Sequence, residues 1–263
     1  MNRFVLAIEY DGTAYSGWQR QDHSTTIQQQ LEIALSKVAD EEVTLLASGR
    51  TDAGVHAWQQ CAHFETAAQR DLKAWVLGVN AQLPPDISIR SVTPVDDRFH
   101  ARYSTIDRTY RYLILNRSSR SALLYRRAAV FYQPLSVELM QRAAQCLVGE
   151  HDFSSFRAAG CQAKHARREI KSIGVTRQGV QIQVQIVGNA FLHNMIRIIV
   201  GSLLRVGSGQ ESVDWLAQVL VARDRKLAGA TAVAAGLYFM GPTYAAEFGI
   251  PDWRESLPAG LGL

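Results

Sequence analysis

One carboxylate stands alone in the polar stretch ASGRTDAGVHAWQQ, residues 47–60, which directly follows an apolar run. Gly49 and Gly54 flank Asp52, and glycines let a backbone approach another molecule closely. An Asp in such a loop can act as a nucleophile or a base. It can equally cap a turn, and taken alone this second interpretation is favoured. No second carboxylate lies nearby, which disfavours a metal site.

A second candidate is Arg197, in the apolar segment AFLHNMIRIIVGSLLRV at 190–206. Apolar residues recur there at helical spacing from Leu192 to Leu203, which predicts a helix buried over much of its surface. A buried guanidinium without a partner is very costly, so Arg197 needs a carboxylate. Asp52 is the natural candidate, and such a pair would keep Asp52 ionised. The alternative is that Arg197 extends to solvent.

A third candidate lies in RTYRYLIL, where strand alternation places Tyr110 and Tyr112 on one face, with Arg108 and Arg111 beside them. A tyrosine bordered by arginines can stack on a base while the arginines bind phosphates. Tyrosine is also an ordinary strand residue that packs inward, and the sequence leaves both interpretations open.

The composition favours a nucleic-acid partner. The chain of 263 residues has a net charge of +4 and a pI of about 9.0, and arginine far outnumbers lysine. A guanidinium binds phosphate through two hydrogen bonds and stacks on bases. Basic loops expected at 116–127 and 157–171 have the charge to hold an RNA backbone. The alternatives are a genome that favours arginine codons and ordinary solvated loops.

Other classes of protein are disfavoured. No apolar run approaches the roughly 18 residues of a membrane span, and the N-terminal apolar stretch is too short for a signal peptide. A cytoplasmic protein is therefore expected. Cys61, Cys146 and Cys161 are widely spaced, which argues against a disulfide framework or a zinc site. The seven histidines are also scattered, so a metal site is not expected.

The order of predicted elements indicates an α/β (α+β) fold. In the first half, strands are predicted at 3–10, 43–47, 59–66 and 87–92 and helices at 25–40 and 71–85. Thr26 and Gln29 fit a capping box at the start of the first helix. This β-α-β-β-α-β order is the split-βαβ pattern, which leaves one face of the sheet free.

The second half repeats that order loosely. Its predicted strands span 108–117, 172–176, 180–188 and 234–240, and its helices span 136–149, 190–206 and 213–222. Within 180–188, apolar residues alternate with glutamine, which predicts one buried face. We therefore expect two split-βαβ (ferredoxin/RRM-like) halves, with mixed, mainly antiparallel sheets flanked by helices and an active-site cleft between them. The expected domains are 1–104 and 105–263.

Four blocks of the sequence carry a family resemblance. YDGTAYSGWQRQ, GRTDAGVHA, FHARYSTIDRTYRY and FLHNMIRIIVG occur in the order found in the bacterial tRNA pseudouridine synthases of the TruA family. The resemblance runs from Tyr10 to about Phe239, and GRTDAGVHA is its most specific block. The C-terminal FGIPDWRESLPAGLGL lies outside these blocks and is not assigned by them.

The resemblance implies an isomerase without cofactor or metal that converts uridines 38, 39 and 40 of the tRNA anticodon stem-loop to pseudouridine. It also implies a homodimer in which tRNA contacts both subunits. Residue by residue, the invariant aspartate of the family falls on Asp52 and the tyrosine beside the target base on Tyr110. The basic partner of the aspartate falls on Arg197, the arginine tied to base flipping on Arg50, and a leucine of the uracil pocket on Leu237.

The chemistry of this reaction fits the residues. The N1–C1′ bond must break and a C5–C1′ bond must form, which needs no redox or phosphate energy. One ionised carboxylate near the sugar, at Asp52, can attack C1′ or remove the 2′ proton, and the sequence leaves both routes open. Two other hypotheses are a non-catalytic RNA-binding module and a hydrolase. The first gives no reason for Asp52 opposite Arg197, and the second lacks a further carboxylate at the usual spacing.

Overall fold

The computed structural model describes residues 1–254, and within them the chain forms two compact units. Unit 1 comprises residues 1–108 and 238–254, and unit 2 comprises 109–237. The expected division was 1–104 and 105–263, so the described residues after 237 lie with the first unit instead. The reason is strand β10 (Leu237–Thr243), which runs parallel to β3 (His56–Thr66) and pairs Tyr238 with His56.

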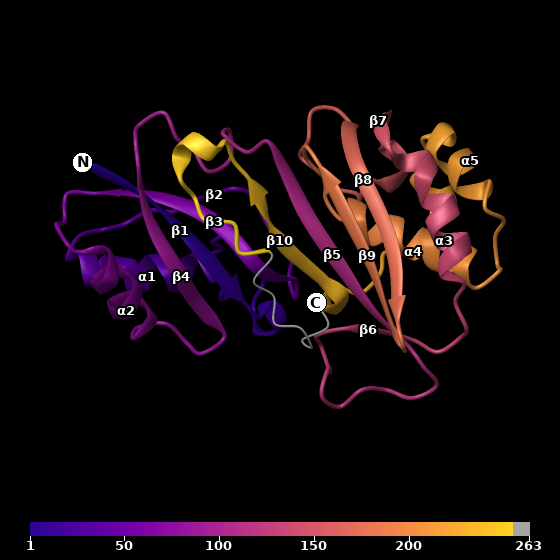
Figure 1. Ribbon diagram of the computed structural model, residues 1–263, viewed down its shortest axis with the longest axis horizontal. Helices are drawn as coiled ribbons and strands as arrows, with labels where there is room; N and C mark the ends of the chain where they lie inside the picture. Colours follow the sequence, from indigo (N-terminus) through magenta and orange to yellow (C-terminus); the bar gives the residue numbers. More distant parts are fainter. Residues whose placement is uncertain (255–263) are drawn as a thin grey trace. The chain divides into compact units, whose positions relative to one another are not determined.

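Unit 1 is built on a sheet whose strands lie in the order β4-β1-β3-β10. Its other elements are β1 (Asn2–Tyr10), β2 (Leu46–Ala47), β4 (Ile87–Val95), α1 (Ile27–Ala39) and α2 (Leu72–Asn80). Strand β1 is antiparallel to β3 and β4, and the short β2 is antiparallel to β3. Figure 1 shows α1 and α2 side by side against these strands. The predicted cap is confirmed, because the Thr26 side chain accepts a hydrogen bond from the Gln29 N–H.

The core between the sheet and the helices of unit 1 is aromatic. Phe4 of β1, Phe64 of β3 and Trp75 of α2 lie with ring centroids 5.3 to 6.0 Å apart. Trp75 and Phe64 are almost completely buried. Rings of this size contribute much of the apolar area that holds helices on a sheet. This packing makes β3 a rigid base for the loop that precedes it.

The second face of this sheet is covered as well, contrary to the expected free face of a split-βαβ pattern. Val5 and Cys61 form a buried cluster with Phe99 and Ala101, and Phe248 packs against it. Burial raises the pKa of the Cys61 thiol to about 12. The covering segments come from before β5 (Asp107–Asn116) and after β10, where no periodic pattern marks them.

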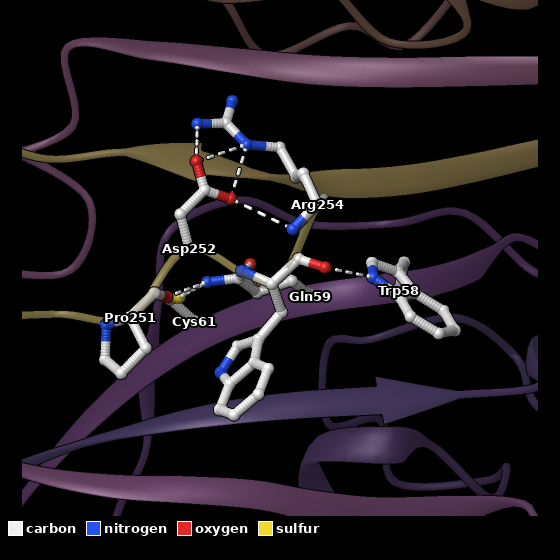
Figure 2. Close-up of polar contacts among 7 residues, drawn as sticks. Trp58, Gln59, Cys61, Pro251, Asp252 and Arg254 are labelled. Atoms are coloured by element: carbon white, nitrogen blue, oxygen red, sulfur yellow. Dashed lines mark hydrogen bonds and ion pairs between the residues drawn. The ribbon is translucent and has the colours of Figure 1, made fainter. Parts of the chain in front are cut away.

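The last described residues form a C-terminal strap, defined as 249–254, along β3 (Figure 2). The Gln59 side-chain amide donates to the Pro251 carbonyl at 2.8 Å and accepts from the Trp253 N–H at 2.9 Å. Trp58 Nε1 donates to the Trp253 carbonyl at 2.9 Å. The Arg90 guanidinium lies 4.4 Å from the Trp58 ring and 4.7 Å from the Trp253 ring. These contacts explain why the C-terminal residues of the described chain belong to unit 1.

Unit 2 has strands in the order β5-β9-β8-β7, with β6 parallel to β5. Its elements are β5 (Asp107–Asn116), β6 (Ala129–Phe131), β7 (Gly149–Asp152), β8 (Arg167–Gln178), β9 (Gln181–Gly188), α3 (Val137–Ala144), α4 (Met195–Gly207) and α5 (Trp215–Ala222). The first two residues of β5 belong to unit 1. Figure 1 shows α3 beside β8, with α4 and α5 grouped around α3 on that side of the strands. The predicted buried face of β9 is confirmed, because Ile182, Val184 and Ile186 are fully buried.

Short 3-10 turns complete the chain at Gly12–Ala14, Gln145–Leu147, Ser154–Phe156, Arg225–Leu227, Ala234–Gly236 and Ala246–Phe248. Helix α4 begins later than expected, because Asn194 takes a left-handed conformation with φ +59°. The predicted fold class, an α/β protein with a mixed sheet flanked by helices, is confirmed. Within residues 1–254, the model has no helix long and apolar enough to cross a membrane.

Candidate active site

Asp52 lies in the loop between β2 and β3, at the first position of a tight turn. The Val55 N–H donates to the Asp52 carbonyl at 3.1 Å, which closes the turn. Gly54 takes φ +76°, a conformation that glycine adopts without steric cost. The Asp52 side chain is half-buried and Arg50 is exposed. The sequence motif therefore forms a loop that presents both side chains at the surface of unit 1.

One side of this loop is held by the segment that follows β1. The Trp18 N–H donates to the Thr51 carbonyl at 3.0 Å, and the Tyr10 hydroxyl and Thr51 Oγ1 lie 2.7 Å apart. The Gly54 N–H points to the Tyr15 carbonyl at 3.4 Å. These contacts join two of the blocks noted in the sequence, YDGTAYSGW and GRTDAG, into one structure.

Two glycines make this close approach possible. Gly17 takes φ +90°, and a Cβ atom there would lie 2.6 Å from the Thr51 carbonyl oxygen. A Cβ atom at Gly12 would lie 2.0 Å from the Val55 carbonyl oxygen. Real Cβ atoms do not approach oxygen so closely, so any side chain at either position would displace the Asp52 loop.

The other side of the loop is held by β3 and by the start of β5. Gln60 Nε2 donates to the Gly49 carbonyl, and the Ser48 hydroxyl donates to Gln60 Oε1, both at 2.8 Å. Arg108 Nη2 donates to the Ser48 carbonyl, also at 2.8 Å. The sequence placed Arg108 only beside a stacking tyrosine, and nothing in its pattern identified Gln60 as a support.

A further support runs from the start of β4. The Tyr15 hydroxyl donates to Asp86 Oδ1 at 2.5 Å, and the Asp11 N–H donates to the Asp86 carbonyl at 2.9 Å. Burial of the phenol and the neighbouring Asp86 carboxylate both raise the pKa of Tyr15. Tyr15 therefore stays protonated and keeps its hydrogen bond, which helps hold the carbonyl that faces Gly54.

In unit 2, Tyr110 and Arg197 each have a defined setting. Tyr110 of β5 is only 8% exposed, and its ring meets the edge of Phe191 at 5.2 Å and 80°. Arg197 of α4 is half-buried. Its Nε donates to the Ala232 carbonyl and its Nη1 to Asn194 Oδ1, both at 2.7 Å. These two hydrogen bonds to neutral acceptors in unit 2 therefore fix the orientation of the Arg197 guanidinium.

The segment that holds Arg197 leads directly to Leu237. The buried Tyr112 hydroxyl donates to the Val233 carbonyl at 2.7 Å, and burial raises the pKa of Tyr112 well above its usual range. A Cβ atom at Gly236 would lie 2.6 Å from the Tyr112 ring. Leu237 follows at 5% exposure. The segment 232–237 therefore accepts hydrogen bonds from Arg197 and Tyr112 and ends at Leu237, which links the positions of these three residues.

The predicted site residues thus fall into two groups, one in each unit. Asp52 and Arg50 share the loop of unit 1, and Tyr110, Arg197 and Leu237 all lie in unit 2. The pairing of Asp52 with Arg197 stays a prediction. Within residues 1–254, no group of three or more His, Cys, Asp or Glu side chains is arranged to hold a metal ion.

Comparison with known proteins finds one matching family model and several relatives that are about half identical to this chain. A family model described as tRNA pseudouridine synthase matches residues 6–104 and 143–245. The chain is 53% identical over 251 residues to tRNA pseudouridine synthase A of Hydrogenovibrio crunogenus, covering 95% of this chain and 96% of that relative. It is 52% identical to the protein of that name from Klebsiella pneumoniae subsp. pneumoniae, over 95% and 92% of the two chains. The relative from Escherichia coli O1:K1 is 51% identical over the same shares.

Proposed function

This chain belongs to the tRNA pseudouridine synthase family, and from that premise we propose that it acts on uridines 38, 39 and 40 of tRNA with Asp52 as its essential carboxylate. Its class follows from the family: it is an isomerase that converts uridine in tRNA to pseudouridine. The positions in the tRNA and the roles of individual residues are the proposal.

The observation that carries the proposal is the way the Asp52 loop is held. Its backbone carbonyls accept hydrogen bonds from the Trp18 N–H on one side and from the Gln60 and Arg108 side chains on the other. A carboxylate that acts on a sugar must be held in a reactive geometry before the substrate arrives. A turn that merely connected two strands would not need glycines placed against it at two separate positions.

The reaction needs few groups beyond the carboxylate. The N1–C1′ bond breaks, the uracil turns, and C5 bonds to C1′; the C5 proton then leaves while N1 gains one. Asp52 either attacks C1′ or removes the 2′ proton, and an ionised carboxylate serves both routes. The target base must leave the helical stack, which costs a few kcal/mol. We propose that Arg50 fills the gap that the flipped nucleotide leaves.

The remaining residues act on the flipped nucleotide. Tyr110 stacks on the uracil, Leu237 lines its pocket, and Arg197 pairs with Asp52 to keep it ionised and oriented. The arginine-rich segments 116–127 and 157–171 bind the tRNA backbone. The family resemblance further supports a homodimer in which tRNA contacts both subunits, and a cytoplasmic location.

The target positions are tested with three tRNA transcripts that each keep one uridine, at position 38, 39 or 40. We expect the enzyme to convert the uridine in all three, as detected by mass spectrometry of nuclease fragments. A fourth transcript without uridine at these positions serves as the control and should stay unmodified. Conversion of a uridine elsewhere, with none at the three positions, would overturn the assignment.

A further inference from the structure

Tyr103, in the connection between β4 and β5, is an aromatic side chain left largely in solvent. Its residue is 77% exposed, more than Tyr125 at 66% or Tyr132 at 61%. The connection begins with Asp96 and Asp97, and Asp96 pairs with Arg98, but no acidic residue follows before Ile106, so Arg102 beside Tyr103 has no acidic neighbour in this stretch of the sequence. An exposed ring beside an arginine is a feature that a binding partner with a flat apolar face and negative charge would match.

The Tyr103 ring is held in place by the turn beneath it. It lies 4.3 Å from the His100 ring, with the planes tilted by 34°. His100 Nδ1 accepts hydrogen bonds from the backbone N–H groups of Arg102 and Tyr103, at 3.1 and 3.3 Å. The His100 ring in turn packs against the ring of buried His63 at 4.7 Å. Tyr103 is thus an exposed ring on a pre-organised support.

A cation accompanies the ring. The guanidinium carbon of Arg102 lies 5.8 Å from the Tyr103 ring centroid, near the limit of a cation–π contact. Within the described part of the chain, the Arg102 side chain forms no ion pair. A flat aromatic face and a guanidinium with no carboxylate partner therefore lie within the span of one nucleotide.

This arrangement is connected to the Asp52 loop. Arg108 Nη2 donates to the Arg102 carbonyl at 3.2 Å and to the Ser48 carbonyl at 2.8 Å. One guanidinium nitrogen therefore joins the turn that carries Tyr103 to the loop that carries Asp52. A nucleotide bound at Tyr103 would be positioned relative to Asp52 through these contacts, all of which lie in unit 1.

We propose that Tyr103 stacks on a base of the tRNA outside the reacting nucleotide, and that Arg102 binds a phosphate of the same stretch. Stacking on an aromatic face tolerates any base, so such a contact holds the strand without selecting its sequence. That property suits an enzyme proposed to act on neighbouring uridines in different tRNAs. Tyr103 is a positioning residue in this proposal, since it takes no part in bond breaking.

The test is tRNA binding in an Asp52→Asn background, which separates binding from turnover. Adding Tyr103→Ala should raise the Kd for tRNA roughly tenfold to a hundredfold, the effect typical of one lost base stack. Tyr103→Phe should bind like its parent, because the ring is kept. Tyr132→Ala, which removes another exposed tyrosine, is the matched control and should leave the Kd unchanged. Since Tyr103 is exposed, the melting temperature should not change in any of these variants.

The kinetics of the single variants add a second readout. Tyr103→Ala alone should raise KM with kcat unchanged, and Arg102→Ala should lower the salt dependence of binding by about one phosphate contact. An unchanged Kd for Tyr103→Ala, or equal losses for Phe and Ala, would overturn the proposal. So would a change of molecular mass in solution for Tyr103→Ala, which would show that the ring contacts a second protein chain. The binding measurement does not depend on the role of Asp52. The proposal for Tyr103 can therefore be overturned while the proposal for Asp52 stands, and the reverse.

Discussion

At the scale of single residues, the contrast between Asp52 and the groups around it defines the site. Asp52 is half-buried, whereas Trp18 and Gln60, which help hold its loop, are buried. A carboxylate with water access on one side and a rigid backbone on the other can meet a sugar without reorganising. In the proposed reaction, the supporting residues position Asp52 and take no part in bond breaking.

Not all buried polar residues near the loop serve the reaction, and His63 of β3 affects stability instead. Its residue is 3% exposed, and the Ala101 N–H donates to its Nδ1 at 3.2 Å. Burial lowers the pKa of His63 to about 4, and the nearby His100 and Arg3 add to this effect. The folded state therefore disfavours the protonated ring, while the unfolded chain binds a proton near pH 6.5.

We predict that the free energy of unfolding falls as the pH falls from about 6.5 to about 4, because only the unfolded state gains a proton at His63 there. After allowing for partial solvent screening, the loss should be roughly 1 to 2 kcal/mol. His63→Gln should flatten this pH dependence in urea unfolding, leaving the smaller share from His100, whose pKa is also lowered by burial. The exposed His23→Gln is the control. An unchanged slope for His63→Gln would contradict this reading.

At the scale of elements, the site depends on two backbone segments packed with no room for a side chain between them. The segment after β1 and the loop before β3 touch at Gly17 and Gly12. Hydrogen bonds from Trp18 and Tyr10 then fasten the contact. The geometry of the Asp52 loop is therefore set as much by the first block of the sequence as by its own.

We predict that Gly17→Ala lowers kcat/KM about a hundredfold, because the new Cβ must push the Thr51 carbonyl and shift Asp52 by a fraction of an ångström or more. Gly179→Ala is the matched control: Gly179 also has positive φ, +58°, but no atom lies within 4 Å of its added Cβ. That control should lose only about 1 kcal/mol of stability, from the left-handed conformation. If the two variants keep equal activity in single-turnover assays, the Gly17 contact does not position Asp52.

Local sequence signals predicted the elements that depend on local physics. The cap at Thr26, the buried face of β9 and the glycine turn after Asp52 all appear as the residue patterns indicate. Contacts between distant segments were not predictable. Strand β6 and the 249–254 strap on β3 depend on partners in other segments of the chain, which periodicity does not encode.

At the scale of the whole molecule, the candidate site was only partly predictable, again because contacts between distant segments leave no local sequence pattern. Asp52, Tyr110 and Arg197 were identified from residue type, position and resemblance, whereas the supports at Gln60, Tyr15 and Asp86 were not. A glutamine in a strand or an Asp before one has many ordinary roles, so only the folded chain reveals the contact. The family membership supplies the reaction, and the two units supply the settings in which its residues are held.

The central claim is that the carboxylate of Asp52 performs the chemistry. It is tested most directly by the release of tritium from C5-labelled uridines of tRNA, measured in a single turnover with saturating Asp52→Asn enzyme. The variant should bind tRNA with a Kd close to that of the wild type and melt at a similar temperature. We predict that its rate falls at least about ten-thousandfold, since the amide neither attacks C1′ nor accepts a proton. Release at a rate near that of the wild type would contradict the account.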